Sequence, residues 1–398
     1  MKKKILIFSH AMEIGGAERA LLGLLNSFDY SKYEVDLFLL KHSGELMPLI
    51  PEKVNLLPEA PAYSAIMMPM VTVLKSGQID VLLGRLIGKL KAKSFNEKMK
   101  YNDSAVSIEY SHKYTKKFMP VISDKEYDIA ISFLTPHYFV AEKVNAKKKI
   151  AWIHTDYSTV DIDIQSELKM WSVYDNIISI SDDVTKAFLS KFPSLEDKII
   201  CIENILSKEF IDTQAELINI KDEFDNSKLK LLSIGRFCEA KNFDNVPEIA
   251  SIIKSKGIDF KWYIIGYGGE EDLIKSKIAE FGMEDTVIIL GKKDNPYPYI
   301  KACDIYIQPS RYEGKAVTVH EAQILNKPII ITDYPTAKSQ LTNGFDGVIV
   351  SLDNQDCADG IAKVIQDKEL QNKLIENMKS TNYSNESEIE KLYKLIED

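Results

Sequence analysis

Two carboxylates eight positions apart, Glu313 and Glu321, are the residues whose types and spacing most directly suggest chemistry. The run 304–308 before them alternates apolar side chains and predicts a buried strand, and residues 316–325 have helical spacing. A strand, a short loop and a helix N-terminus favour an anionic ligand, because free backbone N–H groups point outward there. A carboxylate beside an anion site is best explained if it accepts hydrogen bonds from uncharged hydroxyls of the ligand. We therefore expect a ligand that carries both phosphate and hydroxyls, such as a nucleotide sugar.

This segment and the Pro309-Ser310 pair before it resemble the signature of family 4 of the retaining glycosyltransferases, which have the two-domain GT-B fold. The resemblance implies that Glu313 hydrogen-bonds the hydroxyls of a donor sugar, that Glu321 binds the ribose hydroxyls, and that nearby backbone amides hold the diphosphate. The donor contacts implied in this segment are Glu313, Gly314, Lys315, Ala316, Val317 and Glu321. Two surface glutamates on an amphipathic helix are the alternative. Relatives commonly carry Phe-Gly where this chain has Lys315-Ala316. This difference leaves the identity of the donor sugar open, and an acidic sugar is among the candidates.

Two cations follow the strand that we predict at 229–234. Arg236 comes directly after a glycine, and Lys241 is five residues further on. Such a pair would neutralise the charge that develops on a departing diphosphate, and it matches the Arg…Lys clamp of the family. The alternative is an arginine and a lysine that only meet solvent. Further along, Gly266 resembles the family's Gly-x-Gly turn, and Lys292 lies where relatives seat the nucleotide base.

Three features of the first half of the chain also follow strand ends. Gly15-Gly16 lets the backbone approach a ligand closely, and it matches the family's glycine loop at the donor diphosphate and acceptor. His154 matches a family histidine that contacts the donor sugar; a purely structural histidine is the alternative. His10 ends a strand beside the glycine loop, whereas His320 is expected to face away from the ligand. The catalytic residues that the resemblance implies are His154, Arg236, Lys241 and Glu313.

The composition describes a globular chain with two domains. Its 398 residues are enough for two domains of about 150–200 residues each, and 45% apolar with 27% charged residues is typical of such proteins. No stretch reaches the roughly 18 apolar residues of a membrane span. The net charge of −9 argues against nucleic-acid binding. The four cysteines are Cys201, Cys238, Cys303 and Cys357. They lack metal-ligand spacing and are expected to be reduced thiols in the core, and reduced thiols indicate a cytoplasmic protein.

Strand-like runs alternate with helical patterns, which predicts parallel sheets with crossover helices. The runs of the first half are 5–8, 35–40, 129–133, 149–153 and 177–181. Those of the second half are 229–234, 262–265, 287–290, 304–308, 328–332 and 347–350. The polar stretch 207–226 predicts a linker near 205–228. All candidate groups follow strand ends, where open α/β sheets bind ligands.

We therefore expect an α/β protein of the GT-B type, with two Rossmann-like, doubly wound parallel-sheet domains facing a central cleft. Residues 1–205 are predicted to form the acceptor-binding domain. Residues 206–398 are predicted to form the nucleotide-sugar donor-binding domain. The last helix, about 385–398, is expected to pack back on the first domain.

The resemblance implies transfer of a hexose from a nucleotide-diphosphate sugar, UDP-linked, to an acceptor hydroxyl with retained anomeric configuration. The expected acceptor is a glycan or a lipid-linked intermediate of cell-surface polysaccharide synthesis. A nucleotide-sugar 2-epimerase of the same fold and a non-catalytic GT-B partner subunit are the alternatives. Asp161 and Asp163 form a DxD triplet, but Arg236 and Lys241 make a metal unnecessary, so neither a metal nor another cofactor is expected.

One segment departs from the acidic balance of the chain. Residues 71–120 carry ten Lys and Arg against four Asp and Glu, a local charge of +6. Within 79–93, apolar residues recur at helical spacing, and Arg85, Lys89 and Lys93 follow at four-residue steps. Such a helix can lie on an anionic membrane surface, here the inner face of the cell membrane. The alternative is a helix whose apolar stripe packs on its own domain while the basic residues are only solvated.

Overall fold

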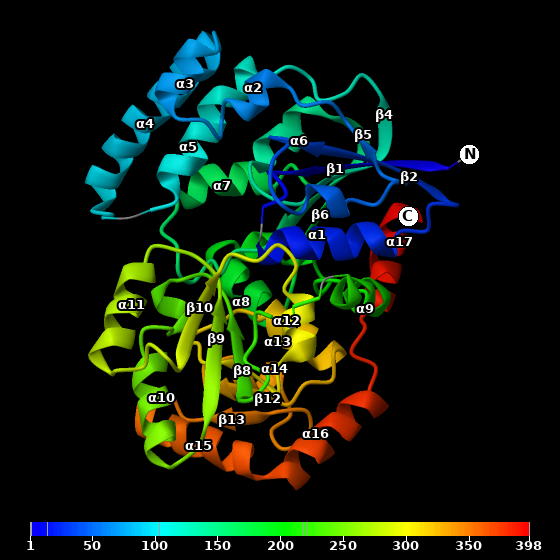
Figure 1. Ribbon diagram of the computed structural model, residues 1–398. Coiled ribbons are helices and arrows are strands. Elements are labelled where there is room, and N and C mark those ends of the chain that lie inside the picture. The colour runs from blue at the N-terminus through cyan, green and yellow to red at the C-terminus, as the bar shows by residue number, and fades with distance from the viewer. Residues whose placement is uncertain (1, 14, 103, 218, 221, 398) are drawn as a thin grey trace. The chain divides into compact units, whose positions relative to one another are not determined.

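The computed structural model describes residues 2–13, 15–102, 104–217, 219–220 and 222–397 (Figure 1). The chain forms two compact units, each built on one parallel sheet. The N-unit comprises Met1–Ile205 together with Glu386–Asp398, and the C-unit comprises Leu206–Asn385.

The N-unit is built on a seven-stranded sheet with the order β3-β2-β1-β4-β5-β6-β7. Its strands are β1 (Lys3–Ser9), β2 (Tyr33–Leu39), β3 (Asn55–Leu56), β4 (Glu126–Ser132), β5 (Asn145–Ile153), β6 (Asn176–Ser179) and β7 (Ile199–Cys201). All neighbouring strands pair in parallel. Residues 5–8 of β1 are 0% exposed, because a central parallel strand is covered on both faces and therefore needs an unbroken apolar run.

The helices of the N-unit include one from the end of the chain. They are α1 (Gly16–Ser27), α2 (Pro61–Ser64), α3 (Met70–Lys75), α4 (Ile79–Met99), α5 (Val106–Thr115), α6 (His137–Lys143), α7 (Ile164–Trp171), α8 (Asp182–Lys191) and α17 (Ile389–Glu397), with 3-10 turns η1 (Met47–Leu49), η2 (Lys116–Phe118), η3 (Pro193–Lys198) and η5 (Glu386–Glu388). On α17, the Tyr393 ring stacks on Tyr33 with centroids 4.7 Å apart, and its hydroxyl accepts a hydrogen bond from the Asp29 N–H. The end of the chain is thereby part of the first domain.

The C-unit is built on a six-stranded parallel sheet with the order β10-β9-β8-β11-β12-β13. Its strands are β8 (Leu229–Ile234), β9 (Phe260–Ile265), β10 (Val287–Gly291), β11 (Ile305–Gln308), β12 (Ile329–Thr332) and β13 (Val348–Val350). Its helices are α9 (Lys208–Glu216), α10 (Val246–Ser255), α11 (Glu271–Glu280), α12 (Tyr297–Ala302), α13 (Val317–Ile324), α14 (Ala337–Gln340), α15 (Asn354–Gln366) and α16 (Lys368–Ser380), with the 3-10 turn η4 (Glu239–Lys241). Leu231 and Leu232 belong to different core clusters, as expected when helices cover both faces of a strand.

The strands agree with the sequence pattern except at the margins of the first sheet. Each predicted run overlaps an observed strand, but β3 and β7 were not predicted. These two strands have two and three residues and form the sheet edges, so they carry too little pattern to recognise. The linker prediction is wrong for 208–216. These residues form α9, whose Ile211 and Ala215 are buried in the core of the C-unit.

Candidate functional site

Glu313 follows the carboxyl end of β11, inside a cluster of hydrogen-bond donors. Its Oε1 accepts hydrogen bonds from Ser310 Oγ at 2.6 Å and from Gln308 Nε2 at 3.2 Å. The Lys241 ammonium pairs with the same oxygen, with Nζ 2.5 Å away, and the Lys241 and Glu313 side chains are only 20% and 10% exposed. No described residue donates a hydrogen bond to the second oxygen, Oε2. The structure thus joins two residues that the sequence suggested as contacts of one ligand.

Arg311 ties together the two loops that carry this pair. Its guanidinium donates two hydrogen bonds to the Asp244 carboxylate, at 2.9 and 2.7 Å, and one to the Glu239 carbonyl at 2.7 Å. Its backbone N–H donates to the Ala240 carbonyl at 2.8 Å. Bidentate contacts of this kind fix geometry as well as add energy. Sequence reasoning missed Arg311, whose only signal was its position next to Ser310.

The remaining C-unit candidates surround the loop after β8. Arg236 is exposed and, among the residues that the structure describes, has no hydrogen-bond or ion-pair partner. A Cβ on Gly266 would lie 1.9 Å from the Gly235 carbonyl oxygen, so glycine is required there by the approach of two loops. Lys292 Nζ lies 4.9 Å from the centre of the Tyr267 ring. The need for Gly266 is therefore explained without a ligand.

The N-terminus of α13 begins a few residues after Glu313. The Val317 N–H belongs to the first turn and has no acceptor within the helix. Ala316 is the N-cap residue, and its N–H donates to Gln340 Oε1 at 2.8 Å. This amide is engaged within the protein, which corrects the expectation that it is ready to meet a diphosphate. Gly314 is exposed and Lys315 is half-buried in the preceding loop.

Glu321 points into the protein interior. It is 0% exposed, and its Oε1 accepts a hydrogen bond from the Tyr297 hydroxyl at 2.9 Å. A ribose could reach this carboxylate only after the covering residues had moved, so the structure does not present Glu321 to a ligand as the sequence suggested. The neighbouring His320 is hydrogen-bonded through Nε2 to the Tyr383 carbonyl at 2.6 Å, outside the Glu313 cluster.

The N-unit candidates lie at strand ends of the first sheet. His154 follows β5, and its ring centroid is 4.5 Å from that of Phe133. Burial lowers the pKa of His154 to about 3 and that of His10, after β1, to about 4. Both rings are therefore neutral near pH 7, and no described residue bonds the buried Nε2 of either. Gly15 is the N-cap residue of α1, and Gly16 is the first residue of that helix.

A cavity of about 190 Å³ in the N-unit lies beside α5 and α7 and was not foreseen. Its apolar lining includes Ile108, Pro136, Val160, Ile162 and Met170. Glu109 also lines it: Oε1 accepts hydrogen bonds from Tyr138 and Ser166, at 2.8 and 2.5 Å, whereas the buried Oε2 has no described partner. Burial raises the pKa of Glu109. Burial, and then the charge of Glu109, raise the pKa of Glu167 in the same lining to about 7. In the sequence, Glu109 resembles any solvent-facing helical glutamate.

The DxD triplet has a local structural role. Asp163 caps α7, with Oδ1 accepting a hydrogen bond from the Ser166 N–H at 3.1 Å and Oδ2 from the Tyr110 hydroxyl at 2.7 Å. In the described part of the chain, no group of three or more His, Cys, Asp or Glu side chains could hold a metal ion. The cysteines are free, but only Cys303 and Cys357 are fully buried; the core prediction fails for the half-buried Cys201 and Cys238.

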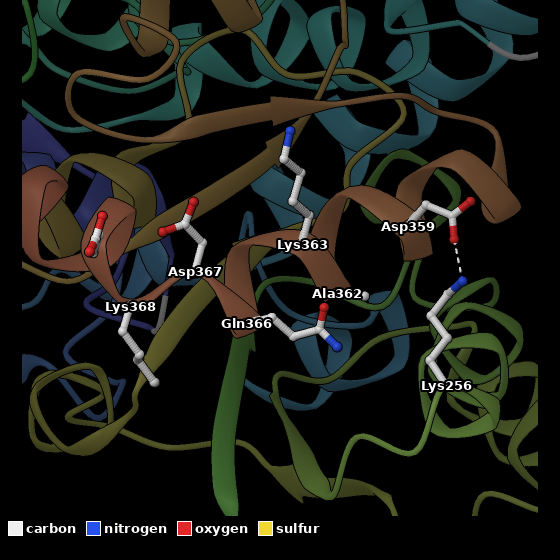
Figure 2. A pocket seen from close by; sticks show the side chains of 8 residues that line it. Lys256, Asp359, Ala362, Lys363, Gln366, Asp367 and Lys368 are labelled. Atoms are coloured by element: carbon white, nitrogen blue, oxygen red, sulfur yellow. Dashed lines mark ion pairs between the residues drawn. The ribbon is translucent and has the colours of Figure 1, made fainter.

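Figure 2 shows a depression on the C-unit whose lining includes none of the candidate residues. It is lined by charged side chains of α15 and α16, and Lys256 and Asp359 form an ion pair of 2.5 Å within it. Lys256 follows the end of α10, so it lies near the edge where the strands begin. Ligands of open α/β sheets bind at the opposite edge. The depression is therefore not part of the candidate site.

The family of the C-unit is decided by a match over its sheet. Residues 215–381 match the family model described as Glycosyl transferases group 1. Residues 215–381 are a glycosyl transferases group 1 domain. This glycosyltransferase domain contains every strand of the second sheet and the Lys241–Glu313 pair.

Curated bacterial glycosyltransferases resemble part of the chain. The chain is 28% identical over 173 residues to N-acetylgalactosamine-N,N'-diacetylbacillosaminyl-diphospho-undecaprenol 4-alpha-N-acetylgalactosaminyltransferase of Campylobacter jejuni, which is 43% of this chain and 44% of that protein. It is 24% identical over 231 residues to poly(ribitol-phosphate) alpha-N-acetylglucosaminyltransferase of Staphylococcus aureus, which is 52% of this chain and 47% of that protein. The similarity thus spans less than half the length of these relatives.

Solved structures resemble the chain over its whole length. Anabaena Alr3699/HepE in complex with UDP and glucose has a TM-score of 0.70 at 15% identity, covering 99% of both chains. TarM has a TM-score of 0.66 at 15% identity, covering 100% of this chain and 99% of that chain. The chain therefore has the fold of GT-B glycosyltransferases, with two Rossmann-like parallel-sheet domains, and the predicted fold class is confirmed.

Proposed function

We propose that this protein is a retaining glycosyltransferase of family 4 that moves a hexose from a UDP-linked donor to a hydroxyl of a glycan or lipid-linked acceptor. The observation that carries the proposal is the Lys241–Glu313 pair beside β11, inside the glycosyltransferase domain. A cation and a carboxylate at one point suit a donor with a charged diphosphate and an uncharged sugar. The UDP bound to the Anabaena neighbour supports uracil as the base of the donor nucleotide.

The donor would meet the C-unit in two places. Arg236, which has no partner among the described residues, and Lys241 would neutralise the diphosphate, next to the first amides of α13. Glu313 would accept hydrogen bonds from sugar hydroxyls through Oε2, while Ser310 and Gln308 hold Oε1 in place. The half-buried Lys315 is close enough in the chain to influence the choice of sugar, including an acidic one.

The reaction would proceed on one face of the sugar. The bond between the anomeric carbon and the β-phosphate oxygen breaks, and the acceptor oxygen bonds to the same carbon on the same face. The acceptor proton passes to the departing phosphate oxygen, and UDP leaves. The protein contributes positioning and charge stabilisation, and the two cations supply the positive charge that a metal would otherwise provide.

We assign acceptor binding to the N-unit and its 190 Å³ cavity. The unpaired Oε2 of Glu109 can accept a hydrogen bond from a sugar hydroxyl, and the apolar lining can cover the C–H face of the ring. Neutral His154 and His10 can exchange hydrogen bonds with hydroxyls without adding charge. Gly15-Gly16 allows the backbone at the start of α1 to come close to substrate.

A panel of UDP-sugars, with and without short glycan acceptors, tests the proposal. We expect a glycoside product whose anomeric configuration, read from its NMR coupling constant, equals that of the donor. An epimerised UDP-sugar formed without acceptor would identify the 2-epimerase alternative. UDP binding with no product from any donor and acceptor would favour the non-catalytic subunit.

A further inference from the structure

Helix α4 turns a row of large apolar side chains towards solvent. These are Ile79, Leu83, Leu86 and Leu90, which are 64%, 49%, 41% and 69% exposed. Their spacing of four, three and four residues places them on one face of the helix. The preceding helix α3 adds Val71 and Leu74, which are 66% and 57% exposed. We call these six residues the leucine surface. Exposed apolar patches of this kind mark interaction sites.

The opposite face of α4 explains why the leucines are left outside. Val81, Gly84 and Gly88 are buried, and each lies two residues before an exposed leucine, which is ~200° around the helix. Helix α5 runs beside α4 (Figure 1). A Cβ on Gly88 would lie 2.6 Å from the Tyr110 carbonyl oxygen, and one on Gly84 would lie 2.8 Å from the Thr115 methyl carbon. Only the glycine face can meet α5. The alternative in which the apolar stripe packs on its own domain is therefore wrong for the four exposed residues, whereas Leu82 and Ile87 of the same helix are half-buried.

Exposed lysines flank the leucine surface. By helical spacing, Lys89 and Lys93 lie on one side of the stripe, and Lys91 and Lys98 lie on the other. A surface depression beside Leu90 is lined by three lysines, Lys89, Lys93 and Lys100, and by one acidic side chain, Glu97, which pairs with Lys93 at 3.9 Å. The flanks therefore carry positive charge around an apolar centre.

Arg85 does not belong to this basic flank. Its Nη1 donates to the carbonyls of Ala65 and Met68, at 2.8 and 2.5 Å, and it therefore holds the turn before α3. The sequence suggested that Arg85, Lys89 and Lys93 meet a membrane together, and the structure removes Arg85 from that set.

We propose that the leucine surface docks on an anionic lipid bilayer, with its apolar side chains inserted at the acyl boundary and its lysines at the lipid phosphates. An apolar centre between cationic flanks is the pattern of a helix that lies in the interface plane. Among the described helices, none is long and apolar enough to cross a bilayer. The surface lies outside residues 215–381 and includes none of the proposed donor contacts.

The test is co-sedimentation of the full chain with vesicles of phosphatidylcholine alone or mixed with phosphatidylglycerol, without donor or acceptor. We expect binding to the mixed vesicles and at least ~10-fold weaker partitioning for Leu83→Gln/Leu86→Gln/Leu90→Gln. Lys89→Gln/Lys93→Gln should weaken vesicle binding at low salt. At high salt, where the charges are screened, the variant and wild type should bind the vesicles equally. The matched control replaces three exposed leucines of the C-unit by Gln: Leu217, Leu273 and Leu352, which are 61%, 43% and 40% exposed.

Three outcomes would overturn the proposal: no binding of wild type to mixed vesicles, equal binding by the leucine variant, or equal loss in the control. Analytical ultracentrifugation of the wild type and the leucine variant measures their oligomeric state in the absence of vesicles. A wild-type dimer that the leucine substitutions dissociate would show that a second copy of the chain covers the surface instead. UDP titration of the α4 variants separates this failure from failure of the proposed transferase, because their substitutions lie outside the C-unit.

Discussion

Replacing Lys241 by alanine is the sharpest perturbation of the proposed donor site. Its ammonium is 2.5 Å from Glu313 Oε1 in a site where the two side chains are only 20% and 10% exposed. Loss of one preorganised charge contact of this kind costs about 3 kcal/mol in the transition state, so kcat/KM should fall at least ~100-fold. In the free protein Glu313 keeps its bonds from Ser310 and Gln308. The free energy of unfolding should therefore fall only by about 1.5–3 kcal/mol, the value of one charged hydrogen bond.

The assay is the initial rate of glycoside formation with the UDP-sugar that the panel identifies, combined with calorimetric titration of UDP. Glu313→Gln should abolish transfer and leave UDP affinity nearly unchanged, because Glu313 is assigned to the sugar. Since Lys241 and Glu313 contact each other, the double variant should lose little more than the more damaged single variant. Lys338→Ala, an exposed lysine of the same unit, is the matched control. A rate within a few-fold of wild type for Lys241→Ala, or strictly additive losses, would refute the assignment.

Four further outcomes are expected. Because the Glu321 carboxylate is 0% exposed and bonded to Tyr297, Glu321→Gln should leave UDP affinity within a few-fold; a loss of ~10-fold or more would show that the carboxylate reaches the ribose. Dialysis against EDTA should leave transfer within a few-fold, and activity that returned only with manganese would contradict the two-cation site. Glu109→Gln should raise the KM for the acceptor and leave UDP affinity unchanged; an unchanged acceptor KM would exclude the cavity of the N-unit as the acceptor site. Burial raises the pKa of Glu167 to about 7 in the folded protein, whereas the unfolded carboxyl has its ordinary value of 4.5. Between these two pH values the folded state binds the proton more tightly than the unfolded state does. The resulting contribution to the free energy of unfolding is therefore lost as the pH rises through 7. Between about pH 5.5 and 7.5, the free energy of unfolding measured with urea should fall by about 2 kcal/mol more for wild type than for Glu167→Gln. Identical pH profiles of the two proteins would contradict the shifted pKa.

The sequence by itself determined both sheets and the types of residue at the candidate site. Strands buried on both faces require unbroken apolar runs such as 5–8, and that pattern is local, so it can be recognised without partners. The cations and carboxylates likewise follow predicted strand ends. The short edge strands β3 and β7 were missed, because they are defined by the strand they pair with.

Only the tertiary structure decided which of these residues meet. Lys241 and Glu313 touch because β8 and β11 are neighbours in the sheet, and strand order is not contained in local periodicity. The burial of Glu321 against Tyr297 depends in the same way on α12 lying beside α13.

Helix α4 shows the same division most clearly. Its sequence determines a helix with an apolar stripe, and periodicity alone would turn that stripe inward. The fold instead packs the face of Gly84 and Gly88, because a helix without side chains at those positions lets α5 approach to contact distance. The leucines are left in solvent by a steric condition that exists only when both helices are in place.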